Sequence, residues 1–264
     1  MVNRRAEPEV DIVGFAKPIL INMLNRPGRL RESLAELAGA AGRPVSVDVD
    51  VHLIRPRRFD EPAGFANCGF RSNLDAHFHA ATWARASGLE RVLVLEDDLS
   101  FAAHWTAHGS ALLQELSRRD WDLASLGYLD NWNEAPTVAA LAGPDGPARH
   151  GWVQFTGRVN GAHAYFVHHS AYDRWIAHLE AVAAGLPGDD LQGPMASDGA
   201  INTFAWVNPQ AVRLLAVPNM VGTRPTRSDI TPGPLDRLPL VADVVEQLRR
   251  WRRWRHGSKA ANFG

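Results

Sequence analysis

Residues 91–98 read Arg91-Val92-Leu93-Val94-Leu95-Glu96-Asp97-Asp98, and this stretch decides the fold of the 264-residue chain. A short, nearly continuous apolar run is typical of a strand that is buried between helices in a parallel sheet. Three acidic residues follow it at the carboxyl end of the strand, where open α/β sheets bind their ligands. The stretch therefore predicts both an α/β fold and the place of a functional site.

Strand and helix patterns alternate along the first half of the chain. Apart from the strand at 91–95, we expect strands at residues 17–22, 45–53, 121–126, 161–167 and 212–217. We expect helices at residues 30–37, 72–87, 102–118, 170–184, 198–206 and 240–255, with Ser72 opening a capping box. The alternation favours a single α/β/α sandwich with a mostly parallel central sheet.

The composition excludes several classes of protein. Apolar residues make up 45% of the chain and charged residues 22%, as in ordinary globular domains. The single cysteine, Cys68, excludes an intramolecular disulfide framework and a Cys-rich zinc module. A net charge of +5 in residues 246–264 and −6 elsewhere is not the pattern of a nucleic-acid-binding domain. No secretory signal and no membrane-spanning apolar run is visible, so we expect a cytoplasmic protein.

The acidic cluster predicts a divalent metal site. Crowded carboxylates repel one another unless a cation or hydrogen bonds compensate their charge. Mg²⁺ and Mn²⁺ prefer oxygen ligands and often share them with water and substrate phosphates. Glu96 and Asp98 point to the same side of an extended backbone because they are two residues apart. A solvated strand end with helix-capping acids is the alternative.

Three separated stretches resemble glycosyltransferase family 25, whose members transfer sugars in lipooligosaccharide and collagen glycosylation. They are Ile19-Leu20-Ile21-Asn22 with Arg26 and Arg29, the helix from Ser72 with Gly88 to Asp98, and Gly161-Ala162-His163-Ala164-Tyr165. The resemblance covers about residues 17–230. Three features depart from the family pattern: Asn73 replaces a histidine, Cys68 lies one residue out of register, and Leu24 or Asn25 replaces polar residues of the first motif.

The resemblance implies a GT-A-like fold and a metal-dependent transfer from a nucleotide-sugar donor to a glycan or lipid-linked saccharide acceptor. It implies a catalytic domain at residues 17–235, after an N-terminal extension at 1–16. Mn²⁺ or Mg²⁺ would bind to Asp98, Glu96 and His163. The donor would contact Asn22, Arg26, Arg29, Glu96, Asp97 and Gly161.

Asp198 is the candidate general base of an inverting reaction, which needs a group to take the proton of the acceptor hydroxyl. Helix capping is the alternative role, and Asp189, Asp190 or Asp130 would then supply the base. Other interpretations also stay open. Asp97 can be a structural acid, Arg26 and Arg29 a solvated helix start, His163 a core histidine, and Gly161 a bulge.

Aromatic and histidine residues outside the motifs are weaker candidates. Trp132 and Trp152 can stack on sugars or anchor a loop. We interpret His77, His79, His104 and His108 as surface or packing residues, because no carboxylate pattern accompanies their helical spacing.

The C-terminal segment 236–264 predicts a basic amphipathic helix in which Trp251 and Trp254 share a face. Such a helix can lie on an anionic membrane, where cell-envelope enzymes meet lipid-linked acceptors. Docking on the catalytic domain is the alternative. For the whole protein, two other functions compete: another metal-dependent nucleotide enzyme, and a catalytically lapsed nucleotide-sugar-binding protein.

Overall fold

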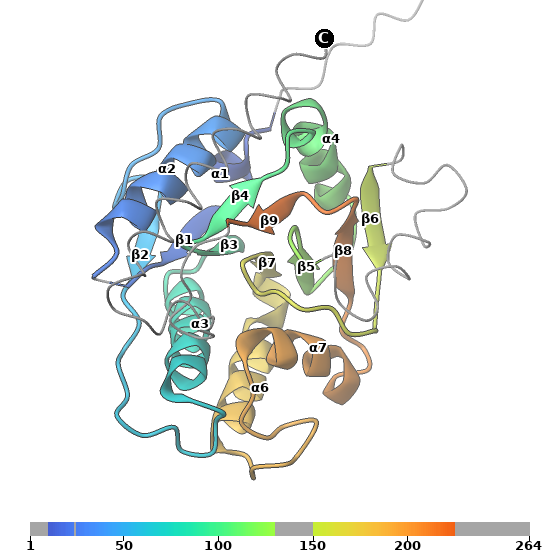
Figure 1. Cartoon of the computed structure of the whole chain (residues 1–264). Coiled ribbons are helices and arrows are strands. Elements are labelled where there is room, and N and C mark those ends of the chain that lie inside the picture. Colours follow the sequence, from blue (N-terminus) through green and yellow to red (C-terminus); the bar gives the residue numbers. More distant parts are fainter. Residues whose placement is uncertain (1–9, 24, 130–149, 225–264) are drawn as a thin grey trace, which may run out of the picture. The chain divides into compact units, whose positions relative to one another are not determined.

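The computed structural model describes residues 10–23, 25–129 and 150–224 (Figure 1). Contacts within the chain separate residues 1–223 from residues 224–264, and the architecture below is that of the first unit. The expected helix at 240–255 and the tail after it lie outside the described residues, as do Asp130 and Trp132.

A seven-stranded sheet forms the middle layer, in the order β2-β1-β3-β7-β5-β8-β6. The strands are β1 (Lys17–Ile21), β2 (His52–Ile54), β3 (Arg91–Glu96), β5 (Leu123–Ser125), β6 (Gly151–Gln154), β7 (Ala164–His168) and β8 (Arg213–Val217). β7 and β6 run antiparallel to their neighbours, and the other five strands share one direction. The mostly parallel sheet is therefore confirmed. β1 and β3 are parallel neighbours, with Ile19 opposite Val94.

Helices cover both faces of the sheet (Figure 1). They are α1 (Ile12–Phe15), α2 (Pro27–Ala41), α3 (Cys68–Ala86), α4 (Trp105–Ser117), α6 (Tyr172–Ala184) and α7 (Ser197–Val207). Val92 and Val94 of β3 pack with α3, α6 and α7, whereas Leu93 and Leu95 pack with α1, α2 and α4. A small second sheet pairs β4 (Leu99–Phe101) with β9 (Val221–Thr223). This is the predicted α/β/α sandwich.

The predicted strand at residues 45–53 is wrong over most of its length. Only β2 is a strand there, and Asp48 to Asp50 form a turn in which Asp48 has a φ of 68°. The Asp50 carboxylate accepts the backbone N–H of Ser46 at 2.9 Å. Such side-chain bonds to the backbone compete with a strand ladder, and they leave Val49 76% exposed.

The start of α3 also differs from expectation. α3 begins at Cys68, four residues before Ser72, because Asn67 caps it by accepting the backbone N–H of Phe70 at 3.0 Å. Within the expected N-terminal extension, Ile12 and Phe15 of α1 pack into the core beside α4. Across the ranges that the structure describes, no helix has the length and apolar character needed to cross a membrane.

Candidate functional site

The strand directions bring the three sequence motifs to one edge of the sheet. β1, β2 and β3 end at this edge, and β7 begins there because it runs in the opposite direction. The backbone N–H of Glu96 donates to the carbonyl of His163 at 3.0 Å, and the N–H of Asn22 donates to the carbonyl of Ile54 at 3.0 Å. Motifs about 70 residues apart in the chain are therefore direct neighbours in the fold.

Asp97 turns toward α2, where it joins two other predicted donor contacts. Its carboxylate accepts from Asn22 Nδ2 at 2.7 Å and from Arg29 at 2.8 Å. The Ser33 hydroxyl donates to the Asp97 carbonyl at 2.9 Å, and Asp97 is only 8% exposed. These bonds tie α2 to the ends of β1 and β3, which fits the interpretation of Asp97 as a structural acid.

Arg55 is a residue of this edge that the sequence analysis did not name. It directly follows β2 and donates to the Asn22 carbonyl at 3.1 Å and to the Asn22 side-chain oxygen. The sequence contains a pattern that could have identified Arg55, because it is a cation at the carboxyl end of a strand. The predicted strand at residues 45–53 had the wrong boundaries, so Arg55 was not placed directly after a strand end.

Glu96 turns toward α3 instead, because side chains alternate along a strand. Its Oε1 accepts from Asn73 Nδ2 at 2.8 Å and is 3.2 Å from His77 Nε2. Burial favours the protonated acid, but the bonds from His77 and Asn73 outweigh it and hold the pKa of Glu96 below its usual value. Asn73, a departure from the family pattern, thus takes part in this network.

His163 lies in a tight cradle of glycines. It is 1% exposed, and its Nε2 donates to the Val221 carbonyl at 2.8 Å. A Cβ at Gly127 would lie 2.3 Å from His163 Nε2, and one at Gly161 would lie 2.9 Å from its Nδ1. Gly161 also has a φ of 112°, which strongly favours glycine. These contacts fit the core-histidine interpretation, because Nε2 is engaged by a backbone carbonyl and the backbone of Gly161 lies close to Nδ1.

Asp198, in the first turn of α7, lies beside this cradle. Its carboxylate accepts the backbone N–H of Gly161 at 3.3 Å and that of Gly199 at 2.8 Å. Burial raises the pKa of Asp198, and the negative charge of Glu96 adds to the rise, while these two N–H groups oppose it. The carboxylate therefore bonds to the start of α7 and also lies near Glu96. By contrast, Asp189 and Asp190 lie exposed in the loop before α7.

Few oxygens of the acidic motif are available to a metal. Within the described ranges, no group of three or more histidine, cysteine and acidic side chains is arranged to hold one. Asp97 is engaged by Asn22 and Arg29, and His163 Nε2 by Val221. Glu96 and Asp98 are the acidic residues of the motif that remain as candidate ligands. This set fits an ion held by one or two carboxylates together with water and phosphate oxygens, as Mg²⁺ commonly is.

The weaker candidates lie apart from this edge or are engaged elsewhere. Trp152 is 5% exposed and its indole N–H donates to the Leu112 carbonyl at 2.9 Å, which fits loop anchoring. His79 is exposed beside Asp75. His104 bonds to the Asn219 carbonyl at 3.1 Å, and the His108 ring stacks on His150. His77 is the exception, because it contacts Glu96 directly.

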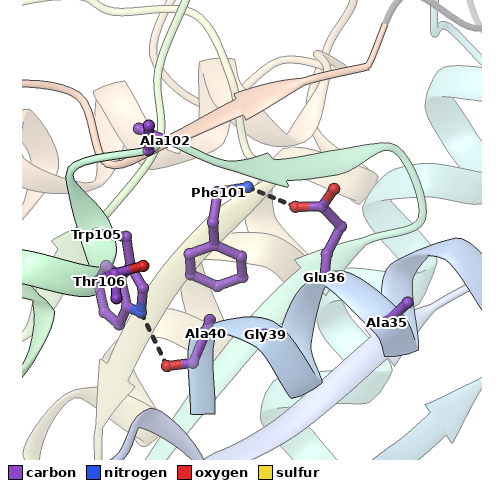
Figure 2. Close-up of a pocket in the computed structure, with 9 residues that line it drawn as sticks. Ala35, Glu36, Gly39, Ala40, Phe101, Ala102, Trp105 and Thr106 are labelled. Atoms are coloured by element: carbon purple, nitrogen blue, oxygen red, sulfur yellow. Dashed lines mark hydrogen bonds between the residues drawn. The ribbon is translucent and has the colours of Figure 1, made fainter. Parts of the chain in front are cut away.

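A cavity of about 390 Å³ lies between α2, β4 and the start of α4. Figure 2 shows the residues that line it. The Glu36 carboxylate accepts the Phe101 N–H at 2.9 Å, and the Trp105 indole donates to the Ala40 carbonyl at 3.0 Å (Figure 2). The Glu36 carboxylate and the Trp105 indole N–H are thus already engaged in hydrogen bonds within the protein. None of the predicted site residues lines this cavity, so we place the candidate site at the sheet edge.

Comparisons with known proteins give limited information. No family model matches the chain, and no curated protein matches it. One similar solved structure is that of a glycosyltransferase involved in the glycosylation of the major capsid of PBCV-1. It has 10% sequence identity and a TM-score of 0.46, over 79% of this chain and 93% of that one. A likeness at this level carries no argument about activity, so the resemblance to family 25 stays a prediction from the motifs.

Proposed function

We propose that the protein is a glycosyltransferase that moves a sugar from a nucleotide-sugar donor to a saccharide or glycolipid acceptor. The observation that supports this best is the position of Asp198. A partly buried carboxylate with a raised pKa lies beside Gly161 and near Glu96, at the sheet edge that also holds Asn22 and Asp98. A candidate base and a candidate donor site are therefore neighbours.

Asp198 is the proposed general base. In an inverting transfer the acceptor hydroxyl attacks the anomeric carbon, and a base takes its proton as the bond to the nucleotide breaks. A raised pKa makes a carboxylate a stronger base at neutral pH. The N–H groups of Gly161 and Gly199 fix the orientation of this carboxylate.

The nucleotide diphosphate is proposed to lie over the start of α2. Arg26 and Arg29 stand at this helix start, and a helix N-terminus attracts anions. Arg29 is held by Asp97, so its guanidinium is already oriented. Arg55 adds a third cation at the same edge.

Asp98 and Glu96 are the proposed ligands of Mn²⁺ or Mg²⁺. A bound divalent ion would offset the negative charge that develops on the leaving nucleoside diphosphate. Contact of residues 236–264 with an anionic membrane, which would bring the protein to a lipid-linked acceptor, is a separate part of the proposal.

The test is a thermal-shift screen of nucleoside diphosphates and nucleotide sugars, with and without Mn²⁺. A ligand at a hundredfold excess over its Kd raises the free energy of unfolding by about 2.7 kcal/mol. We expect a rise in Tm for one nucleotide class only when Mn²⁺ is present, and loss of that rise on adding EDTA. Binding without sugar transfer to any acceptor would instead identify a lapsed nucleotide-sugar-binding protein. The absence of any nucleotide-dependent shift would reject the proposal.

A further inference from the structure

The buried imidazole of His77 has no part in the reaction proposed above, yet both of its nitrogens are hydrogen-bonded. His77 on α3 is 0% exposed. Its Nδ1 is 2.8 Å from the hydroxyl of Tyr165 on β7, and its Nε2 is 3.2 Å from Glu96 Oε1 on β3. One histidine therefore links a helix and two antiparallel strands at the point where the acidic motif begins.

The partners of the ring decide where its hydrogens lie. Glu96 Oε1 already accepts a hydrogen bond from Asn73 Nδ2 at 2.8 Å, so we assign it as the acceptor from His77 as well. Nε2 then carries a hydrogen. The Tyr165 hydroxyl can then donate to Nδ1, which corresponds to the Nε2–H tautomer of the ring. The tyrosine is thus placed to orient the ring that orients Glu96.

The two oxygens of Glu96 have different surroundings. Asn73 and His77 both hold Oε1, whereas no hydrogen bond to Oε2 is seen from the part of the chain that the structure describes. The Glu96 side chain is 23% exposed, so a ligand can reach it. Fixing one oxygen stops rotation of the carboxylate and gives the other a defined position.

We propose that His77 is a positioning residue, which holds Glu96 Oε1 through its Nε2–H so that Oε2 is presented to the bound nucleotide or its metal. The proposal rests on the function proposed above for the ligand that Glu96 binds. The hydrogen-bond geometry itself does not depend on that function, so the two can be tested separately.

The activity test compares His77→Leu with His77→Gln. Leucine fills a similar volume without a donor, whereas the glutamine amide keeps a donor near the position of Nε2. We expect His77→Leu to lower turnover or nucleoside diphosphate affinity by roughly 10–100-fold, as loss of a ligand-orienting partner does. His77→Gln should recover most of that loss. Equal losses in the two variants, or no loss in either, would show that His77 only packs.

A matched pair of tyrosine variants tests the contact between Tyr165 and His77. Tyr165→Phe removes the hydroxyl beside His77 and should lower turnover less than His77→Leu does. Tyr172 belongs to the same core cluster, and its hydroxyl has no hydrogen-bond partner among the described residues. Tyr172→Phe should therefore leave turnover unchanged. Equal effects of the two tyrosine variants would count against the proposal.

NMR of protein labelled with ¹⁵N-histidine gives a readout that needs neither nucleotide nor turnover. The His77 signals, identified by their loss in His77→Leu, should show a hydrogen on Nε2 that shifts in Glu96→Gln. If the wild type neither binds nor turns over any nucleotide sugar, the proposed function fails, and this spectrum alone decides the inference. An Nδ1-bound hydrogen facing Tyr165 with no response to Glu96→Gln would overturn it. The same spectrum decides the matter if His77→Leu does not fold, with Tyr165→Phe then identifying the signals.

Discussion

At the scale of residues, Glu96 and Asp97 are neighbours in the chain but bond to different helices. Glu96 accepts from Asn73 and His77 on α3, while Asp97 accepts from Arg29 on α2. The cause is the alternation of side chains along β3, which sends successive residues to opposite faces of the sheet. We therefore expect Asp97 to have a different role from Glu96.

Replacing Asp97 and Asp98 by alanine should separate stability from binding. Asp97→Ala leaves Arg29 and Asn22 without their shared acceptor, and we expect it to lower the free energy of unfolding by about 3 kcal/mol. Asp98→Ala should change stability little and abolish Mn²⁺-dependent nucleotide binding. Urea denaturation and calorimetric titration measure the two effects. Retained metal dependence in Asp98→Ala would refute its assignment as a ligand.

The Asp198→Asn variant tests the proposed base. Asparagine keeps the shape, and its one amide oxygen can still accept from either Gly161 or Gly199, but it cannot take a proton. We expect turnover to fall by on the order of 10²–10⁴-fold while donor affinity changes little. If affinity falls and the turnover of bound donor does not, Asp198 positions the donor. If neither changes, it only caps α7, and Asp189, Asp190 or Asp130 becomes the next candidate.

At the scale of elements, the antiparallel insertion of β7 forms the candidate site. A parallel strand at this place would put Gly161 and His163 at the opposite edge, away from Glu96. Because β7 is reversed, its start lies beside the end of β3, with Leu95 opposite Ala164. Close packing at this junction depends on glycines, since neither Gly127 nor Gly161 has room for a Cβ.

A pair of glycine substitutions tests this packing. In Gly127→Ala the new methyl group would meet His163 Nε2 at 2.3 Å and the Val221 carbonyl at 2.4 Å. We expect a loss of about 1–3 kcal/mol in the free energy of unfolding, or more if the backbone cannot shift. Gly39→Ala, inside α2 with nothing within 4 Å of the new Cβ, should instead stabilise the protein by roughly 0.5–1 kcal/mol. Equal melting temperatures of the two variants would contradict the described junction.

At the scale of the whole molecule, the three layers allow acidic groups to lie close together at one end of a buried sheet. Burial raises the pKa of Asp198 above 3.8, so the folded protein holds this proton more tightly than the unfolded chain does. The stability that this group contributes is fully present below about pH 3.8 and is lost as the pH rises through the folded-state pKa.

Stability measured at two pH values tests this linkage. Asp198→Asn removes the titrating group, so its unfolding free energy relative to wild type should be higher near pH 7 than near pH 4. Urea denaturation of both proteins at both pH values gives the comparison, in which all other titrating groups cancel to first order. A difference that is independent of pH would mean that Asp198 has the same pKa in the folded and unfolded states.

The sequence by itself determined the layers of this protein and the strands of its core. Continuous apolar runs such as Val92–Leu95 and helical spacing such as that of Phe70, Leu74 and Phe78 are local patterns. Strands and helices with such apolar faces must pack against one another to bury them, and a sheet between two layers of helices is one of the few arrangements that does so. The pattern was misleading at residues 45–53. The alternating valines predicted a strand there, but the Asp50 carboxylate hydrogen-bonds to the backbone of Ser46 and stabilises a turn.

Only the tertiary structure decided which residues meet at the sheet edge. Arg55 bonds to Asn22 across 33 positions, and His77 bonds to Glu96 across 19 and to Tyr165 across 88. Such pairs depend on strand order, strand direction and helix rotation, which no local pattern of side chains contains. The sequence therefore placed Glu96, Asp97 and Asp98 at the end of a strand. The antiparallel direction of β7 brings His163 beside Glu96, and the orientation of α3 about its axis brings His77 to the same residue.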